Sequence, residues 1–272
     1  MLTSDVTRDD DRGLVHVTLQ GALTSCTAPL VINTVLKCLA EQPVAVVIDV
    51  GGLNSRTNVA VPVFLTLRRY ARRDPPVPLV VVAPRSSPGS GLRGPLGRYV
   101  PAVATVADAG ELARRWPAAD RWRHQRLAAD IEAPSVARSL VAQACAQWQL
   151  SHLLYAGRTL VSELVDNAVQ HAGTEIRLTV TQRAHFLCMA VRDGSPALPQ
   201  VREPRCDDPR LPLDIRGYGL RTVDRLAFSW GAEVTTEGKV VWATLHTEGG
   251  AVAKPVRPAG SRAAVWAGRS AR

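Results

Sequence analysis

The sequence has no long apolar run and no closely spaced pair of cysteines. Its longest apolar stretches, such as "VAVVIDV" and "PLVVVA", are far shorter than a membrane-spanning helix. The polar start "MLTSDVTRDDDRG" lacks the apolar segment of a secretory signal. The five cysteines form no C-x-x-C pair and have no metal-ligand spacing, so we expect structural thiols. These absences favour a cytoplasmic protein without membrane association.

Lysine is also scarce, and it occurs only as Lys37, Lys239 and Lys254. The formal net charge of +9 therefore comes almost wholly from arginine. A nucleic-acid surface would need this charge clustered on one element with aromatic residues between, whereas here it is dispersed. We expect no direct contact with nucleic acid. The length of 272 residues is enough for two domains, each with its own core.

The first domain is expected at residues 12–116, where strand-like and helix-like segments alternate. "VAVVIDV" and "VPLVVVAP" are apolar runs of the kind buried on both faces of a sheet. "TAPLVINTVLKCLAE" and "VAVPVFLTLRRYARR" carry apolar residues at helical spacing. The alternation predicts an α/β domain with a mixed or parallel sheet covered by helices. The polar segment 117–133 is expected to be a linker.

The second domain, expected at residues 134–247, has a different order of elements. Two helices beginning near Pro134 and Ser151 come first, and the strands "EIRLTVTQ" and "FLCMAVRD" follow. A proline-rich loop, a short helix after "GYG" and a hairpin that turns at Glu237 to Lys239 complete it. This order predicts an α+β two-layer sandwich. Residues 248–272 show no sustained period and are expected to be a disordered basic tail.

The helix "LVSELVDNAVQHAG" carries an unusual polar stripe. Glu163, Asn167 and His171 fall at i, i+4 and i+8, so they lie along one face of the helix. A carboxylate, an amide and an imidazole without lysine or arginine suit a ligand or a metal. The alternative is an ordinary polar helix face, and for His171 a structural role at the helix end.

Two further segments point to a ligand. Asp193 shares the period-two parity of Leu187, Met189 and Val191, so it is expected to point inward. A buried carboxylate needs a donor, which an adenine amino group would supply; the alternative is a structural aspartate that caps the turn "DGSP". After the proline-rich loop, the glycines of "RGYGLRTVDRLA" precede a helix and would let backbone N–H groups approach an anion; the alternative is a plain flexible turn.

In this order, "SELVDNAVQHA", "VRDGSPALP" and "GYGLRTVDRLAFSWG" resemble the GHKL ATPase superfamily with its Bergerat-type fold, most closely the anti-sigma-factor serine kinases. The resemblance runs from about Leu127 to His246. It implies that Asn167 binds a Mg²⁺ that bridges the ATP phosphates, that Glu163 is the base for a serine hydroxyl, and that Asp193 reads adenine. The other implied nucleotide-binding positions are Gly194, Arg216, Gly217, Gly219, Leu220 and Thr244. Asp193-Gly194-Ser195 departs from the Asp-x-Gly of many relatives, so ATP binding is better supported than turnover.

Residues 12–115 resemble a STAS domain, the fold of anti-sigma-factor antagonists. The stretches that carry the resemblance are "LVHVTLQGALTSCTAP", "VAVVIDVGGLN" and "VPAVATVADAGELAR". Antagonists of this family are phosphorylated on a serine in a D-S-S-G motif. The corresponding positions here are Thr57-Asn58-Val59-Ala60, which lack that serine. We therefore expect this domain to dock or sense a partner and not to accept phosphate.

Together the resemblances imply a regulator that binds ATP and Mg²⁺ and phosphorylates a serine of a separate STAS antagonist. Its partners would be that antagonist, a sigma factor or both, and a homodimer is expected by analogy with the family. The alternative is a non-catalytic switch, in which ATP occupancy only changes which partner is bound. A sensor histidine kinase is disfavoured, because "RWRHQRLAADIEAP" is too short to provide its dimerising helix.

Overall fold

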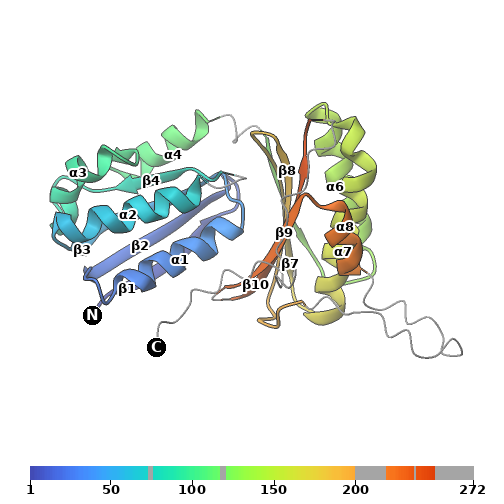
Figure 1. The fold of residues 1–272 in the computed structure, drawn as a ribbon, viewed down its shortest axis with the longest axis horizontal. Coiled ribbons are helices and arrows are strands. Elements are labelled where there is room, and N and C mark those ends of the chain that lie inside the picture. Colours follow the sequence, from blue (N-terminus) through green and yellow to red (C-terminus); the bar gives the residue numbers. More distant parts are fainter. Residues whose placement is uncertain (73–75, 117–120, 200–218, 236, 249–272) are drawn as a thin grey trace, which may run out of the picture. The chain divides into compact units, whose positions relative to one another are not determined.

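The computed structural model describes residues 1–272 except 73–75, 117–120, 200–218, 236 and 249–272. The chain divides into two compact units, Met1–Trp122 and Arg123–Arg272, and each carries a five-stranded sheet (Figure 1). None of the helices in the described ranges has both the length and the apolar character that crossing a membrane would need. The expected tail at 248–272 lies, apart from Glu248, outside the described residues.

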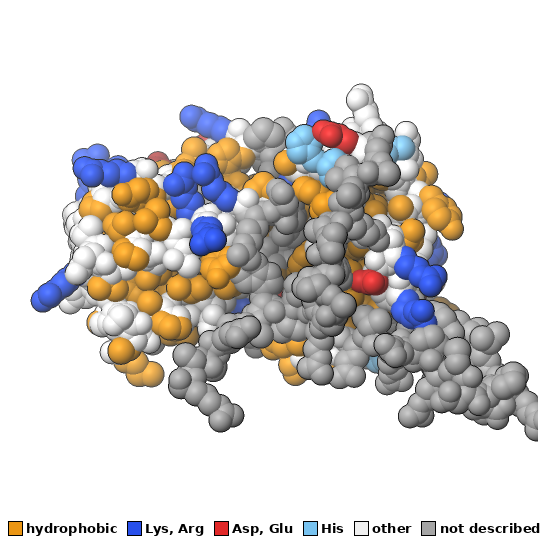
Figure 2. Space-filling view, viewed as in Figure 1, with side chains coloured by type: hydrophobic (Ala, Val, Ile, Leu, Met, Phe, Trp, Pro, Cys, Tyr) orange, Lys and Arg blue, Asp and Glu red, His pale blue; other side chains and the backbone are white. Residues whose placement is uncertain are grey.

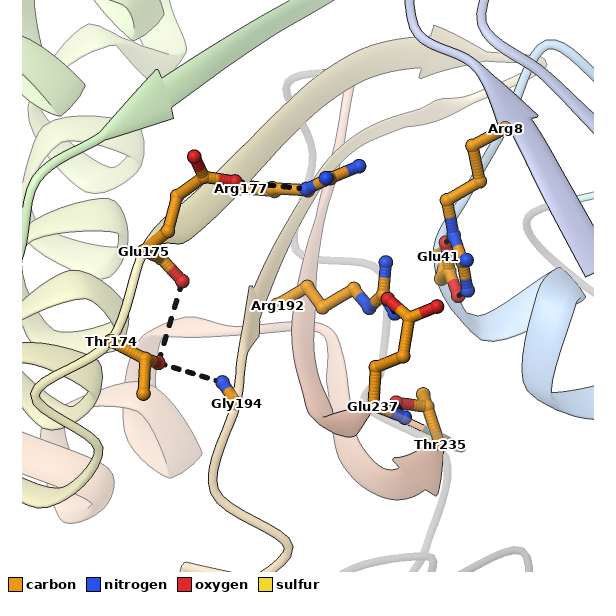
Figure 3. A network of polar contacts seen from close by, with 9 residues as sticks. All are labelled: Arg8, Glu41, Thr174, Glu175, Arg177, Arg192, Gly194, Thr235 and Glu237. Carbon is orange, nitrogen blue, oxygen red and sulfur yellow. Dashed lines mark hydrogen bonds and ion pairs between the residues drawn. The ribbon is translucent and has the colours of Figure 1, made fainter.

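The first sheet has the order β1-β2-β3-β4-β5. β1 pairs antiparallel with β2, and β2 to β5 are parallel, so the predicted mixed sheet is confirmed. The strands are β1 (Thr3–Asp9), β2 (Leu14–Ala22), β3 (Ala45–Asn54), β4 (Leu79–Val82) and β5 (Ala102–Val103). The expected domain start at residue 12 omitted β1. Arg8 of β1 is joined to Glu41, just after α1, by two hydrogen bonds of 2.7 and 2.8 Å (Figure 3).

Helices cover both faces of this sheet. The first-unit helices are α1 (Ala28–Ala40), α2 (Thr57–Ala71), the 3-10 helix η1 (Pro88–Leu92), α3 (Arg93–Gly97) and α4 (Val106–Arg114). Phe64 and Leu67 of α2 are buried in one cluster with Ile48 of β3. Ala109 of α4 packs in a separate cluster with Val47, because successive residues of a buried strand face opposite sides.

The second sheet has the order β6-β7-β8-β10-β9, and the pairs β7–β8, β8–β10 and β10–β9 are antiparallel. Its strands are β6 (Trp122–Leu127), β7 (Ile176–Arg183), β8 (Phe186–Asp193), β9 (Ser229–Thr235) and β10 (Gly238–His246). β6 lies inside the segment 117–133 that was expected to be a linker, so that expectation missed a strand. Its polar sequence "WRHQRL" joins the sheet by pairing with β7 and not through an apolar pattern of its own.

The helices of the second unit lie together on one side of its sheet (Figure 1). They are α6 (Ala133–Gln147), the 3-10 helix η2 (Ser151–Leu153), α7 (Leu154–His171) and α8 (Gly219–Leu226). Leu160 and Leu164 of α7 share one buried core with Met189 and Val191 of β8. This arrangement is the predicted α+β two-layer sandwich, and the helices expected near Pro134 and Ser151 are confirmed.

Charged side chains are spread thinly over the surface in view. On the face shown in Figure 2, Lys and Arg side chains stand in separate small groups, with apolar and uncharged side chains between them. This distribution matches the dispersal of arginine along the sequence.

Candidate functional site

The stripe predicted on "LVSELVDNAVQHAG" lies on α7, and its three members differ in burial. Glu163 and Asn167 are half-buried, whereas His171 is exposed. The Nδ2 atom of Asn167 is buried and has no hydrogen-bond partner among the described residues. Buried polar groups are nearly always hydrogen-bonded, so this amide is available to a ligand. The Nδ2 group is a donor and suits a phosphate oxygen. The oxygen of the same amide is a ligand type that Mg²⁺ accepts, so the side chain is compatible with the role that the sequence resemblance implied.

Glu163 lies against the first residue of α8. A Cβ atom added to Gly219 would be only 2.3 Å from Oε2 of Glu163, so the absence of a side chain at Gly219 lets the two helices approach. The N-terminus of a helix carries partial positive charge, which favours a negative group beside it. Glu163 and Gly219, predicted from separate motifs, are therefore brought together.

The environment of Glu163 makes its carboxyl a stronger proton acceptor. Burial, and then the neighbouring carboxylate of Asp166, raise the pKa of Glu163. Burial also raises the pKa of Asp166, although the charge of Arg138 acts in the opposite direction. The Nη1 atom of Arg138 donates a hydrogen bond of 3.1 Å to the hydroxyl of Ser162. A carboxylate whose pKa lies closer to neutrality is a better general base.

Asp193 points into the core side of the sheet, as its parity predicted, and is 2% exposed. Its Oδ1 accepts hydrogen bonds of 2.9 Å from the backbone N–H of Ser195 and of 2.9 Å from Nζ of Lys239. Lys239 is itself 1% exposed and sits directly opposite Asp193 in the β8–β10 register. The bond from Ser195 is the turn-capping contact that was the alternative to an adenine donor, whereas Lys239 was not among the predicted site residues. Lys239 precedes the core residues Val241 and Ala243 by two and four positions, so the period-two pattern of this strand could have placed its side chain on the same face as Asp193.

The turn after Asp193 is tied to the end of α7. Gly173, with φ of +60°, turns the chain after α7, and the hydroxyl of Thr174 then accepts a 2.8 Å hydrogen bond from the N–H of Gly194 (Figure 3). Gly238 fits closely against the same turn, because a Cβ there would lie 1.9 Å from the carbonyl oxygen of Asp193. Gly194 is therefore held between two segments, beside the carboxylate that the resemblance assigns to adenine.

The remaining predicted positions fall in three groups. Leu220 is half-buried and packs against the core of the second unit. Arg216 and Gly217 lie outside the described residues. Thr244 pairs with Cys188 and lies on the sheet face opposite Asp193, since Val241, Ala243 and Leu245 occupy the core face of β10. Its hydroxyl donates to the carbonyl of Ser229, so the structure does not bring Thr244 to the other site residues.

The fold of the second unit is an α+β two-layer sandwich. Residues 127–245 match the family model described as the histidine kinase-like ATPase domain. The second unit is accordingly a histidine kinase-like ATPase domain, which implies ATP binding.

Two solved structures are similar to the chain in its N-terminal region. An anti-sigma factor antagonist from Mycobacterium paratuberculosis has 23% sequence identity and a TM-score of 0.34, covering 42% of this chain and 95% of its own. The anti-sigma factor antagonist SpoIIAA in its unphosphorylated form has 15% identity and a TM-score of 0.34, covering 42% of this chain and 100% of its own. No curated protein matches the chain.

Proposed function

We propose that the second unit binds Mg-ATP and that the chain uses it to control an anti-sigma-factor partner switch. The observation that carries the proposal is the α7 stripe inside a histidine kinase-like ATPase domain. There the Nδ2 atom of Asn167 is buried without a hydrogen-bond partner in the described part of the chain, and the carboxylate of Glu163 meets the N-terminus of α8 at Gly219.

Each side chain has a defined role in this proposal. Asn167 would hold Mg²⁺, which supplies charge to the phosphates when bound. Asp193 would accept from the adenine amino group, with Gly194 in the adjoining turn. The first turn of α8, with Gly219 and Leu220, would present backbone N–H groups to the phosphates. Arg216 and Gly217, outside the described residues, would complete the phosphate contacts.

The reaction we propose is phosphoryl transfer to a serine of a separate STAS antagonist. Glu163 would accept the proton of the serine hydroxyl while the oxygen bonds to the γ-phosphorus and the bond to ADP breaks. The raised pKa of Glu163, caused first by burial, suits this role. The partners would be the antagonist, a sigma factor or both, with the chain as a homodimer in the cytoplasm.

The first unit would dock or sense a partner. The positions expected to hold the phosphorylated serine of an antagonist lie in the first turn of α2 as Thr57-Asn58-Val59-Ala60. The missing serine favours docking over phosphate acceptance. The missing serine also supports a second candidate function, in which ATP binding changes which partner is bound without any phosphoryl transfer. The sequence Asp193-Gly194-Ser195, a departure from Asp-x-Gly, favours that alternative as well.

A titration of the full chain with ATP, with and without Mg²⁺, tests the binding step. We expect Mg²⁺-dependent binding that Asn167→Ala weakens and that the control Asn58→Ala, on an exposed position of α2, leaves unchanged. The absence of ATP binding by the wild type would refute the proposal.

Transfer of labelled phosphate to a STAS antagonist tests the catalytic step. Glu163→Gln should abolish transfer and keep ATP binding, whereas the exposed control Glu132→Gln should keep both. ATP binding without transfer by the wild type to any STAS antagonist would decide for the non-catalytic switch.

A further inference from the structure

The second unit contains a fully buried ion pair on the helix-covered face of its sheet. The side chain of Lys239 is 1% exposed and that of Asp193 is 0% exposed, and Nζ lies 2.9 Å from Oδ2. Burying two charges costs desolvation energy, and an apolar pair of similar volume is often at least as stable. Stability alone therefore gives a poor account of this pair.

The two carboxylate oxygens of Asp193 differ in the hydrogen bonds that they accept. Oδ1 accepts from Nζ of Lys239 and from the N–H of Ser195, both at 2.9 Å. Oδ2 is buried and accepts no hydrogen bond that meets normal geometry from the described residues, although Nζ is close to it. One oxygen is thus engaged by two donors, and the other still has acceptor capacity.

The backbone fixes this lysine in place. Lys239 and Asp193 occupy directly opposed positions of antiparallel strands, where side chains on one face are nearest neighbours. Gly238 precedes it with φ of +139° and lies so close to the Asp193 carbonyl that a Cβ would have no room. Nζ also lies 3.4 Å from the carbonyl oxygen of Ser195, to which it donates. The hairpin therefore delivers the ammonium group to the carboxylate and to the turn that follows it.

We propose that Lys239 is a positioning residue that sets the base specificity of the nucleotide site. The ammonium supplies the opposite charge that a buried carboxylate needs, so Asp193 acts only as an acceptor. At the 6-position of the purine, an acceptor-only group accepts a hydrogen bond from the amino group of adenine and repels the oxo group of a 6-oxo purine, which is another acceptor. This inference rests on the proposed ATP site and adds to it the residue that makes the site selective for adenine.

The test compares ATP with inosine triphosphate, which carries a 6-oxo group in place of the 6-amino group. Dissociation constants of both are measured by titration of the full chain for the wild type, Lys239→Met, Asp193→Asn and the double variant. Lys239→Met should lower the preference for ATP about tenfold or more, because the ammonium group that holds and charge-balances the carboxylate is lost. In the Asp193→Asn background the same change should leave the ratio unaltered, since Lys239 acts through Asp193.

Controls separate this role from a general structural one. Lys37→Met, on α1 of the first unit, should keep the wild-type ratio, and Lys239→Arg, which retains the charge, should keep more of it than Lys239→Met. Thermal unfolding followed by circular dichroism establishes that each protein is folded at the temperature of titration. If Lys239→Met does not fold, Lys239→Gln and Lys239→Arg are compared in its place.

The outcomes distinguish the two proposals. Equal weakening of both nucleotides by Lys239→Met, or an unchanged ratio, would overturn the specificity role and leave the ATP site standing. A wild type that binds neither nucleotide would overturn both proposals.

Discussion

Replacing Gly219 with alanine should set a methyl group against the carboxylate of Glu163. The added Cβ would lie 2.3 Å from Oε2 and 3.3 Å from Cδ. Because real Cβ contacts are essentially never shorter than 3.0 Å, Oε2 must move from 2.3 Å to at least that distance. The mobile atom is the end of a flexible side chain, so we expect the carboxylate to rotate while α8 stays in place.

Two effects of similar size oppose one another in this variant. Forcing the carboxylate from its preferred rotamer costs about 0.5–1.5 kcal/mol. Alanine is better than glycine in a helix by about 0.8–1.0 kcal/mol in the interior, and by less at the first position. Gly219→Ala alone should therefore change the free energy of unfolding by less than about 1 kcal/mol. In a Glu163→Ala background the contact disappears, and the same change should be stabilising.

Urea denaturation of the four proteins in this cycle measures the coupling between the two positions. We expect a coupling energy of about 0.5–1.5 kcal/mol. Gly110→Ala, in α4, is the matched control because a Cβ there meets nothing within 4 Å, and its effect should not depend on residue 163. Additivity of Gly219→Ala and Glu163→Ala within about 0.3 kcal/mol would refute the close approach of α8 to Glu163.

Three further predictions concern the same region. Burial and the charge of Asp166 raise the pKa of Glu163 in the folded protein. The protonated carboxyl therefore contributes stability at pH values below the unfolded pKa of about 4.3, and this contribution is lost as the pH rises through the raised pKa of the folded protein. Glu163→Gln should therefore be more stable than the wild type at pH 7 and lose that advantage near pH 4, in urea denaturation at several pH values; a constant difference would contradict this. Asn167→Ala should reduce affinity for Mg-ATP about tenfold or more while changing the free energy of unfolding by less than about 1 kcal/mol, because the Nδ2 group has no hydrogen bond to lose. Calorimetric titration measures the affinity and urea denaturation the stability, and a large loss of stability in this variant would contradict the prediction. Thr174→Val should cost about 0.5–1.5 kcal/mol by removing the acceptor of the Gly194 N–H. Thr159→Val, whose hydroxyl donates to the carbonyl of Tyr155 within α7, should cost less in the same denaturation assay.

Periodicity predicted the interior elements of both units better than the edge strands. The apolar run "VAVVIDV" became β3 at the centre of its sheet, and the helical spacing around Leu160 and Leu164 became α7. β1, with the sequence "TSDVTRD", is an edge strand, and β6, "WRHQRL", ends the order of the second sheet. Such strands form because a neighbour offers backbone hydrogen bonds, which an apolar pattern does not record.

For the candidate site, a single local period was enough to predict on which face of its element a residue lies. The helical repeat placed Glu163 and Asn167 on one stripe, and strand parity placed Asp193 inward. Applied to β10, the same parity would have put Lys239 with Asp193 and excluded Thr244, which is five positions further on. The contact of Glu163 with Gly219 joins two segments distant in sequence, and only the packing of α7 against α8 reveals it.

The register of β10 against β8 determines which residue lies opposite Asp193, and the length of the β9–β10 hairpin turn sets that register. A slip of β10 by one position would place Val240 opposite Asp193 and turn Lys239 to the other face of the sheet. The buried carboxylate would then face hydrocarbon without a cation. Deletions or insertions of a single residue in this turn should therefore be tolerated far less than substitutions. The length of the loop is as much a part of the proposed base recognition as the side chains.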